Sequence, residues 1–416
     1  LGLARPVLPN SSIQSSILNL SETNANTFNG NGFVDITFLK DFKFTFNAGT
    51  TVREQRYFTT SNPFYGFGAE QNGTISVYHY RTTTLNLQQI LNYNRSFGKH
   101  NVSAMLGHES YKYNYVQLSA GKKNMFSYWG NHELNGAIID AASADSYATD
   151  YNTEGYFFRG LYDYDGKYFF SGSYRRDASS RFHPDHWWGN FYSIGAAYLI
   201  SREDWFKTNW VDLLKIKFSI GQQGNDNIDP FQYLLKYQLG RNYVFGGTDM
   251  VGLYQKGFPN NNVTWEVADT WNIGTEGTFW NGLLGFEVEY FKTKRSNILA
   301  KRNASIPKYT GLIDLPNENI GRVQNQGMEI QLSHFNKIGE VNFRASGNFM
   351  FARNKVLFMD ETPWGEGHEY MNETGSPMGA GLQYRAIGIF RDQAALDAYP
   401  HLDAARPGDL IFEDVD

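Results

Sequence analysis

Apolar and polar residues alternate along most of this chain with the two-residue period of a β-strand. In residues 156–164 every second residue is aromatic or glycine, whereas Arg159 and Asp163 fall on the opposite face. The pair Asp165-Gly166 has the chemistry of a tight hairpin turn, and the alternation resumes in residues 168–174. The pattern predicts an antiparallel hairpin, and the same plan recurs along the chain.

Six hairpins of this kind are expected from the alternation and its turns. The predicted strand pairs are 34–38 with 42–48, 85–93 with 102–106, 156–164 with 168–174, 192–200 with 214–220, 271–279 with 284–290, and 328–332 with 341–349. Residues 336–339 are expected to turn the last hairpin, and a helical turn with Trp205 and Trp210 at an interface is expected between residues 200 and 214. Further strands at 12–20 and 382–390 would bring the total to about fourteen.

The predicted connections alternate in length. They are short inside hairpins and long between them, as in 119–154 and 221–270. Short turns at one end and long loops at the other are typical of an outer-membrane β-barrel. Sandwiches and propellers also alternate, so a large soluble β-protein stays open on this pattern alone.

In a membrane barrel, water is present only on the inner side of the strands. The polar members of the alternating pattern are therefore expected to face the lumen, and the apolar ones lipid. The lumen-facing set comprises Lys43, Asn92, Arg159, Glu287, Glu289 and Arg344.

Composition narrows the class of protein further. The chain has 416 residues with a mean hydropathy of -0.48, and its longest uncharged apolar run, 194–200, is shorter than the ~18–20 residues of a membrane helix. The absence of cysteine excludes a disulfide-stapled fold and thiolate chemistry. The net charge is -5 with no basic block, so no nucleic-acid partner is expected.

Several separated motifs resemble the barrel of the SusC/RagA family of TonB-dependent outer-membrane transporters. They include SGSYRRDASSRF, WWGNFYSIGAAYLIS, DLLKIKFSIGQQGNDNI, VTWEVADTWNIGTEGTFWNGLLGFEVEYF, IGRVQNQGMEIQL and GSPMGAGLQYRAIGIF. The resemblance covers residues 155–416, and the first part of the chain shares with the family only its succession of hairpins. Ala178 stands where the family usually has glycine, and Gln223 where it usually has threonine; both fit local turn variation.

The resemblance implies an all-β fold: a transmembrane antiparallel β-barrel of about 22 strands around a plug. It also implies TonB-dependent import of an oligosaccharide or oligopeptide across the bacterial outer membrane, together with a SusD-like surface lipoprotein. No segment resembles the plug or the N-terminal region that contacts the TonB complex. Residues 1–416 are therefore expected to form part of such a barrel with long extracellular loops, its plug and C-terminal strands lying outside this chain. A soluble all-β polysaccharide-acting enzyme and a passive porin are the alternatives.

Two groups of residues are candidates for substrate binding. Trp187 and Trp188 have the chemistry to stack on sugar rings, although the aromatic girdle at the membrane surface is the preferred interpretation. Asn225, Asp226 and Asn227 begin a long loop, where amides and carboxylates either bind a polar ligand or make turns.

Metal and catalytic sites are not expected in the strands. Asp414 and Asp416 have the spacing of the first ligands of a calcium loop, so calcium in a loop is the one cofactor considered. Glu287 and Glu289 share a strand face, as an acid pair in a glycosidase does, but the alternation around them favours the lumen. No nucleophile or metalloprotease motif is present, so the sequence predicts no catalytic residue.

Overall fold

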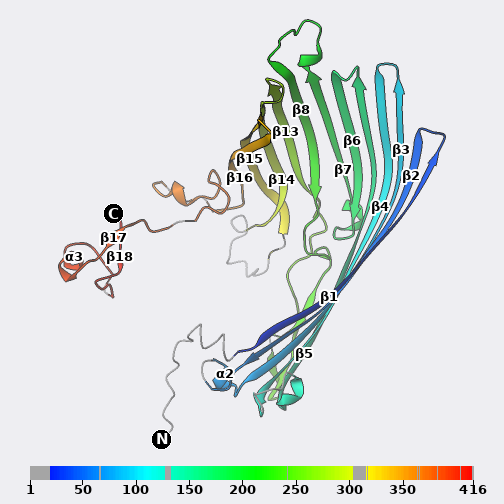
Figure 1. Ribbon diagram of the computed structural model, residues 1–416. Coiled ribbons are helices and arrows are strands. Elements are labelled where there is room, and N and C mark those ends of the chain that lie inside the picture. Colours follow the sequence, from blue (N-terminus) through cyan, green and yellow to red (C-terminus); the bar gives the residue numbers. More distant parts are fainter. Residues whose placement is uncertain are drawn as a thin grey trace.

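A computed structural model describes residues 19–64, 67–126, 133–240, 242–302, 315, 317–362, 364, 366–381, 383–402 and 404–414. Its main body is one twelve-stranded antiparallel sheet in which each strand pairs with the next along the chain (Figure 1). The strands are β1 Ser21–Phe38, β2 Phe42–Ser61, β3 Thr74–Phe97, β4 His100–Met125, β5 Ala137–Tyr164, β6 Tyr168–Ser179, β7 Trp188–Leu199, β8 Val211–Asn225, β13 Glu266–Phe279, β14 Leu284–Lys301, β15 Asn317–Ile338 and β16 Val341–Phe358. All six predicted hairpins are confirmed.

Short elements connect or extend this sheet. They are α2 Phe67–Glu70, η1 Leu134–Gly136, η2 Pro184–His186, η3 Ile200–Arg202, β9 Tyr237–Leu239, β10 Tyr243–Phe245, β11 Thr248–Met250, β12 Leu253–Gln255, η5 Glu369–Met371, β17 Ala386–Ile389, α3 Gln393–Asp397 and β18 Leu410–Phe412. The helical turn expected after β7 is η3. In the described ranges no helix is both long and apolar enough to cross a bilayer.

The prediction of a barrel strand at residues 382–390 is wrong. Only β17 forms there, and it pairs with β18 in a separate two-stranded sheet. Residues 386–389 do form a strand, but this strand pairs with a segment close in sequence rather than with β16. Most of the other predicted extra strand, 12–20, lies outside the described residues.

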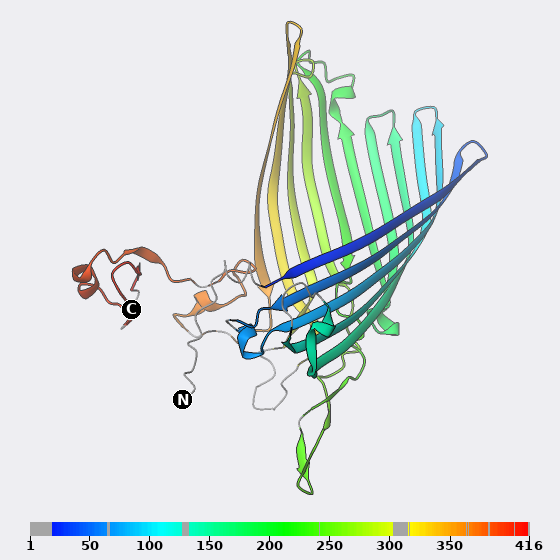
Figure 2. The same cartoon turned by 60° about the horizontal axis from the view of Figure 1, so that its bottom comes forward.

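The hairpin turns lie together at one end of the sheet, and the longer connections at the other (Figure 2). Asp165 and Gly166 have φ angles of 57° and 61°, the left-handed geometry that a two-strand reversal requires. The Lys99 ammonium lies 2.8 Å from the Asp165 carboxylate, and this hydrogen bond holds the pKa of Asp165 below its usual value. In the last hairpin, β15 continues to Ile338, so the turn is shorter than the predicted 336–339.

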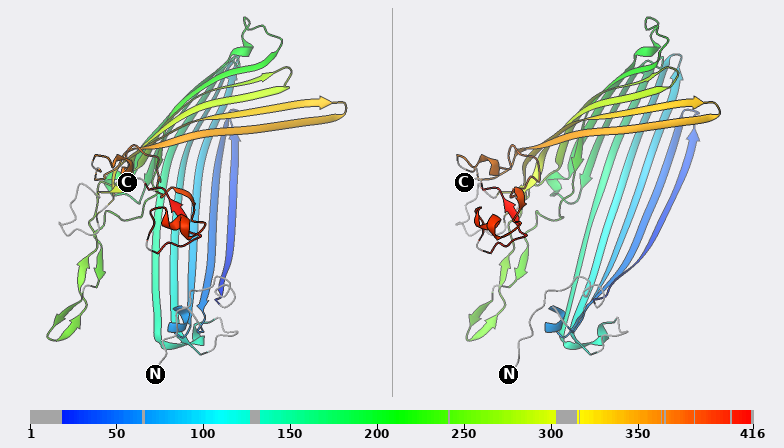
Figure 3. Two further views of the ribbon diagram at one scale, coloured as in Figure 1. Left: turned by 90° about the vertical axis from the view of Figure 1, so that its left-hand side faces the viewer. Right: turned by 60° about the vertical axis from the view of Figure 1, so that its left-hand side comes forward.

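The prediction that 119–154 forms a long loop is wrong, because β4 runs to Met125 and β5 begins at Ala137. β5 has 28 residues and a length of about 90 Å, whereas a membrane strand needs roughly 9–11 residues. Where both faces of a strand meet water, the apolar alternation disappears while the backbone ladder continues. Strands β1 to β5 accordingly extend well past the ends of β6 and β7 (Figure 3).

Cross-strand pairing divides the sheet into two continuous faces. Lys43 pairs with Asn92, and Arg159 continues the same face into β5. The ladder through β6, β7, β8 and β13 carries this face to Glu287 and Glu289 on β14 and, through β15, to Arg344 on β16. We call it the polar face. It places all six residues of the predicted lumen-facing set together, and that this face lines a lumen remains a prediction.

The opposite, apolar face is not packed against anything in the described structure. Ile194 is 61% exposed, Phe170 53% and Phe349 57%. Soluble proteins rarely leave so large a contiguous apolar surface in water, whereas a barrel in lipid requires one. The apolar face therefore has the character of a lipid-facing surface.

Aromatic rings border this apolar face at two levels. Near the hairpin turns, Tyr168 stacks on Tyr198 at 5.0 Å between ring centroids. Towards the other end, Tyr156 stacks on Trp188 at 6.1 Å. On β5, Tyr156 to Tyr164 is nine residues, roughly 26 Å along the strand, which matches the ~9–11 residues that a tilted strand needs to cross a bilayer. We call the region between these rings the apolar band.

The two ends of the sheet are open. In the sheet order β1 and β16 each have a single neighbour, and in the described residues they do not pair with one another. Both strands are exposed along nearly their whole length. The arrangement is thus a curved section of barrel wall.

Candidate functional site

Tyrosine side chains cover the polar face of β2 to β5 beyond the apolar band. Alternate residues of β4 place Tyr111, Tyr113 and Tyr115 on this face, because side chains on one face recur every second residue. Tyr113 stacks on Tyr151 of β5 with ring centroids 4.9 Å apart. We call the whole set the tyrosine wall: Tyr57, Tyr78, Tyr80, Tyr111, Tyr113, Tyr115, Tyr147 and Tyr151.

A cavity of about 610 Å³ lies between the tyrosine wall and the loop that follows β8. The wall contributes Tyr113, Tyr147 and Tyr151, and Thr149 lies between the last two. Arg181 enters from the connection between β6 and β7. The loop contributes Asn227, Ile228, Asp229, Pro230 and Gln232. Polar groups of several kinds therefore meet aromatic rings in one cavity.

The loop is held in place by contacts with the end of β6. Asp226 accepts a hydrogen bond from the Ser179 hydroxyl at 2.7 Å, and its backbone carbonyl accepts one from Arg181 Nη1 at 2.9 Å. Phe182, Phe191, Val263 and Trp265 form a small hydrophobic core against which Ile228 packs. These contacts fix the mouth of the cavity.

Arg181 and Thr149 carry buried polar atoms that have no partner among the described residues. The Arg181 guanidinium lies over the Tyr151 ring at 3.9 Å from its centroid, a cation–π contact. No carboxylate of the described residues lies within 4.0 Å of Arg181 as an ion-pair partner, and its Nε is buried without an acceptor. The Thr149 hydroxyl is likewise buried and unpaired. A buried polar group without a partner costs about 1–3 kcal/mol, so both groups favour a ligand that supplies one.

Two tyrosines of the wall have raised pKa values. Burial, together with the neighbouring Tyr151 hydroxyl, raises the pKa of Tyr111 to about 12. Burial also raises the pKa of Tyr115. Tyr111 and Tyr115 therefore present neutral hydroxyl groups and apolar ring faces at physiological pH.

β5 continues beyond the point where its neighbour stops. Its pairing with β6 begins at Thr153, whereas its pairing with β4 extends to Ala137. The last contact on the β6 side is made by Ser180, whose N–H donates to the Asn152 carbonyl at 3.0 Å. Among the described residues, 143–151 of β5 thus pair on one side only. We call the line alongside them, which no described strand occupies, the open lane; it starts beside Arg181 and the cavity.

The structure divides the predicted substrate-binding residues. Asn227 lines the cavity, and Asn225 and Asp226 hold the loop that forms it. Trp187 donates its indole N–H to the Phe182 carbonyl at 2.9 Å, and Trp188 lies on the apolar face against Tyr156. The two tryptophans are not brought together with the loop residues; Trp188 lies with Tyr156 at the border of the apolar face, and its interpretation as a girdle residue stays a prediction.

Sequence reasoning missed the tyrosine wall. Residues 111–115 read Tyr-Lys-Tyr-Asn-Tyr, and this alternation was a usable signal. Its meaning depends on residues 119–154 being strand, because the loop predicted there assigns no face to the tyrosines. Arg181 carried no local signal, since its role depends on contacts with a loop distant in sequence.

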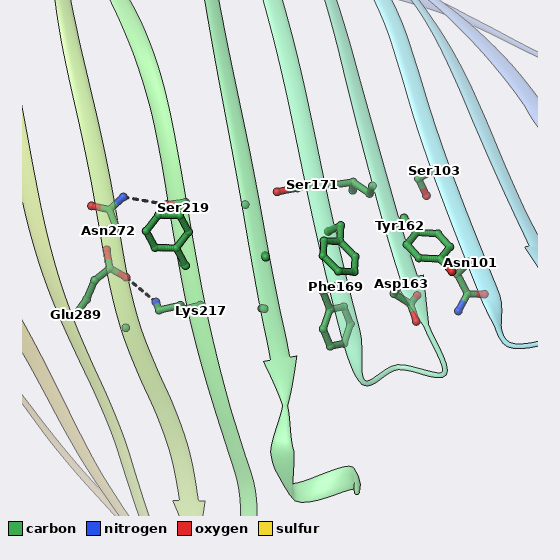
Figure 4. Close-up of a pocket in the computed structure, with 17 residues that line it drawn as sticks. Asn101, Ser103, Tyr162, Asp163, Phe169, Ser171, Lys217, Ser219, Asn272 and Glu289 are labelled. Atoms are coloured by element: carbon green, nitrogen blue, oxygen red, sulfur yellow. Dashed lines mark hydrogen bonds and ion pairs between the residues drawn. The ribbon is translucent and has the colours of Figure 1, made fainter.

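Charged groups on the polar face of β8, β13 and β14 form ion pairs. Lys217 forms an ion pair with Glu287 and another with Glu289 at 2.7 Å, and Lys215 pairs with Glu276 at 3.0 Å. Of these residues, Lys217 and Glu289 border a hollow of about 460 Å³ together with Ser219 and Asn272 (Figure 4). Because Lys217 holds both carboxylates, they do not have the separate environments that distinguish the acid from the base in a glycosidase.

No metal site emerges from the candidate residues. Asp414 donates its backbone N–H to the Tyr399 hydroxyl at 3.0 Å, and Asp416 lies outside the described residues. Across the described part of the chain, no group of three or more potential ligands has a metal-binding arrangement. Calcium binding remains an untested prediction.

A Gly224→Ala variant is expected to loosen the loop mouth. A Cβ atom at position 224 would lie 2.0 Å from the Phe191 ring, so the ring must leave the small core around Trp265. Overpacking of this kind typically costs about 1–3 kcal/mol. Urea unfolding of the protein in liposomes measures the loss, with Gly172→Ala as the control because its added Cβ meets nothing within 4 Å. Equal stability of the two variants would contradict the assignment of Phe191 to this core.

Comparison with known proteins agrees with the architecture. Residues 5–394 match the family model described as TonB dependent receptor-like, beta-barrel. The chain is 27% identical over 421 residues to the TonB-dependent receptor P3 of Formosa agariphila, covering 95% of this chain and 41% of that protein. It is 28% identical over 340 residues to the TonB-dependent receptor SusC of Bacteroides thetaiotaomicron, covering 79% and 33% respectively.

Solved structures show the same fold. The RagAB peptide transporter superposes with a TM-score of 0.74 at 23% identity, over 83% of this chain and 38% of the other. A TM-score of 0.71 at 22% identity is obtained for the closed-closed state of the RagAB peptide importer. The chain spans less than half the length of each relative that it matches here.

Proposed function

Since this chain belongs to the family of TonB dependent receptor-like β-barrels, whose SusC and RagA relatives are outer-membrane proteins, we propose that it serves in TonB-dependent import of a nutrient oligomer. The substrate class proposed here is an oligosaccharide or an oligopeptide. One observation carries most of the proposal: a polar, tyrosine-walled cavity opens on the polar face beyond a lipid-facing apolar band.

The position of the cavity suits capture of a substrate before it crosses the membrane. The cavity lies at the end of the sheet that carries the long connections, whereas the hairpin turns lie at the other end (Figure 2). Aromatic rings and amide groups bind polar oligomers without a catalytic group. Equilibrium binding only shifts populations, so uphill transport requires an external energy source, which TonB supplies in this proposal.

A SusD-like surface lipoprotein is the proposed partner. One arm projects from the connection after β8 at the same end as the cavity; β9 pairs with β12 in it, and the β10–β11 hairpin lies between them in sequence (Figure 2). Their side chains include Leu239, Phe245 and Leu253, which are 66–75% exposed. Exposed apolar side chains on a projecting arm favour contact with another protein, and a lid over the cavity needs such an anchor.

Deleting TonB is expected to abolish uptake of the oligomer by cells that carry the full-length protein. The measurement is accumulation of a labelled oligomer too large for general porins, with a small porin-permeant sugar or dipeptide as the control. Uptake that continues without TonB would support a passive pore instead. Cleavage of the oligomer by the purified protein would support the polysaccharide-acting enzyme.

A further inference from the structure

We infer that the open lane beside β5 binds an extended oligopeptide as an added β-strand, with the carboxylate end of the peptide at Arg181. The inference rests on the proposed import function and assigns its substrate class. Two independent observations carry it: an unpaired stretch of strand backbone, and an arginine without a carboxylate at the start of that stretch.

The lane has the backbone geometry that a peptide strand needs. Ser180 donates to the Asn152 carbonyl, so Asn152 directs its backbone groups towards the β6 side. In an antiparallel sheet these groups alternate between sides, so Asp150, Ala148 and Ser146 direct theirs into the lane as well. Addition of a strand to a free sheet edge is a recurring mode of peptide recognition, in which main-chain hydrogen bonds provide the affinity.

The lane is in water rather than in lipid. Residues 143–151 lie beyond Tyr156, which marks the border of the apolar band, and residues 143–148 are exposed. The Ser146 N–H donates a hydrogen bond to Oδ1 of the adjacent Asp145 at 2.9 Å, a local contact that a bound peptide can replace. An edge left open in this way pairs readily with another extended chain.

Arg181 sets the direction of the peptide. It lies where β6 ends and the lane begins, its Nε–H lacks an acceptor, and its charge is balanced by no carboxylate of the described residues within ion-pair distance. A terminal carboxylate placed there supplies both the acceptor and the charge, through the strong hydrogen bonds that guanidinium and carboxylate groups form. The peptide then runs parallel to β5, from residue 143 towards residue 151, with its carboxyl end beside the cavity.

The residues beside the lane allow a bound peptide to carry many different side chains. Tyr147 and Tyr151 point to the polar face next to the lane, and both contribute to the cavity wall. Main-chain recognition combined with flat aromatic neighbours places few demands on the peptide sequence. A saccharide, by contrast, would use the rings and the polar groups of the cavity and leave the strand edge unused.

Isothermal titration of the full-length protein with an octapeptide of alanine and serine tests the inference. Binding should weaken about tenfold or more when the free carboxylate is amidated. It should also weaken when alternate peptide N–H groups that face β5 are methylated, but not when the other alternate set is methylated. Side-chain recognition alone would not produce this two-residue period.

Ala148→Pro removes one N–H that faces the lane. Proline is tolerated on an edge where no partner strand needs that N–H, so the barrel should assemble normally. Peptide affinity should fall about fivefold or more, while the matched Ala148→Val variant, which keeps the N–H, should bind as the parent does. Arg181→Met should lose the preference for the free carboxylate without losing the methylation period.

Other outcomes separate this inference from the proposed function. The inference would be overturned if the protein bound an uncharged glucose hexamer in place of the peptide and Ala148→Pro had no effect on that binding. TonB-dependent uptake of the same hexamer would still support the import function. Peptide binding that is insensitive to both Ala148→Pro and N-methylation would also overturn it. Peptide binding with these sensitivities but without TonB-dependent uptake would uphold the lane and overturn import.

Discussion

An Ile194→Lys variant is expected to lose about 2–4 kcal/mol of folding free energy in a bilayer, the cost of a lysine near the midplane on the lipid face of a barrel strand. Ile194 lies on the apolar face of β7 between the two aromatic levels marked by Trp188 and Tyr198, and it is 61% exposed. The measurement is unfolding in urea of the full-length protein in liposomes, followed by the heat-dependent shift of the folded band in electrophoresis.

Ser193→Lys provides the matched control. Ser193 precedes Ile194 on the same strand but lies on the polar face, where its hydroxyl is 2.7 Å from that of Ser173. Losing that hydrogen bond costs about 1 kcal/mol, and the new ammonium group points to the side assigned to water. If Ser193→Lys is the more damaging of the two, the assignment of lipid and lumen faces is reversed.

Residues 1–416 alone are expected not to form a stable barrel in liposomes. β1 and β16 each have 18 residues and leave an unpaired edge, and every backbone group of an edge in lipid costs several kcal/mol. Electrophoresis without heating should show no folded band for this chain, whereas a chain that includes further strands of the barrel should give one. A folded band for residues 1–416, with β1 cross-linked to β16 through introduced cysteines, would contradict this expectation.

Local chemistry made the hairpins predictable from the sequence. Alternation defined the two faces inside the apolar band, and turn residues such as Asp165-Gly166 fixed where each strand reverses. The resemblance to a transporter family then supplied the barrel, which alternation alone did not distinguish from a sandwich. The six polar positions from Lys43 to Arg344 fell on one face because the two-residue period persists through every paired strand.

The parts of the candidate site that the sequence did not predict lie where apolar and polar residues no longer alternate with the two-residue period of a strand. Residues 143–150 of β5 are mostly small and polar, since neither face of the strand there touches lipid or a core. The contact between Asp226 and Ser179 joins segments that no local pattern relates. The cavity and the open lane both result from a difference in strand length between β5 and β6, and strand length is the quantity that turn and alternation signals define least.

The order of the strands has a consequence for the kinetics of assembly. Every strand from β1 to β8 pairs with its sequence neighbour, so this part of the wall can form one hairpin at a time with small losses of chain entropy. The pairing of β8 with β13 is different, because it requires the connection 226–265 to close into a loop. Each doubling of loop length raises the entropic cost of closure by about 0.6 kcal/mol. We expect β1–β8 and β13–β16 to form as two separate sheets that join late. A pulse-labelled folding experiment should therefore find the cavity, which depends on that connection, among the last features to appear.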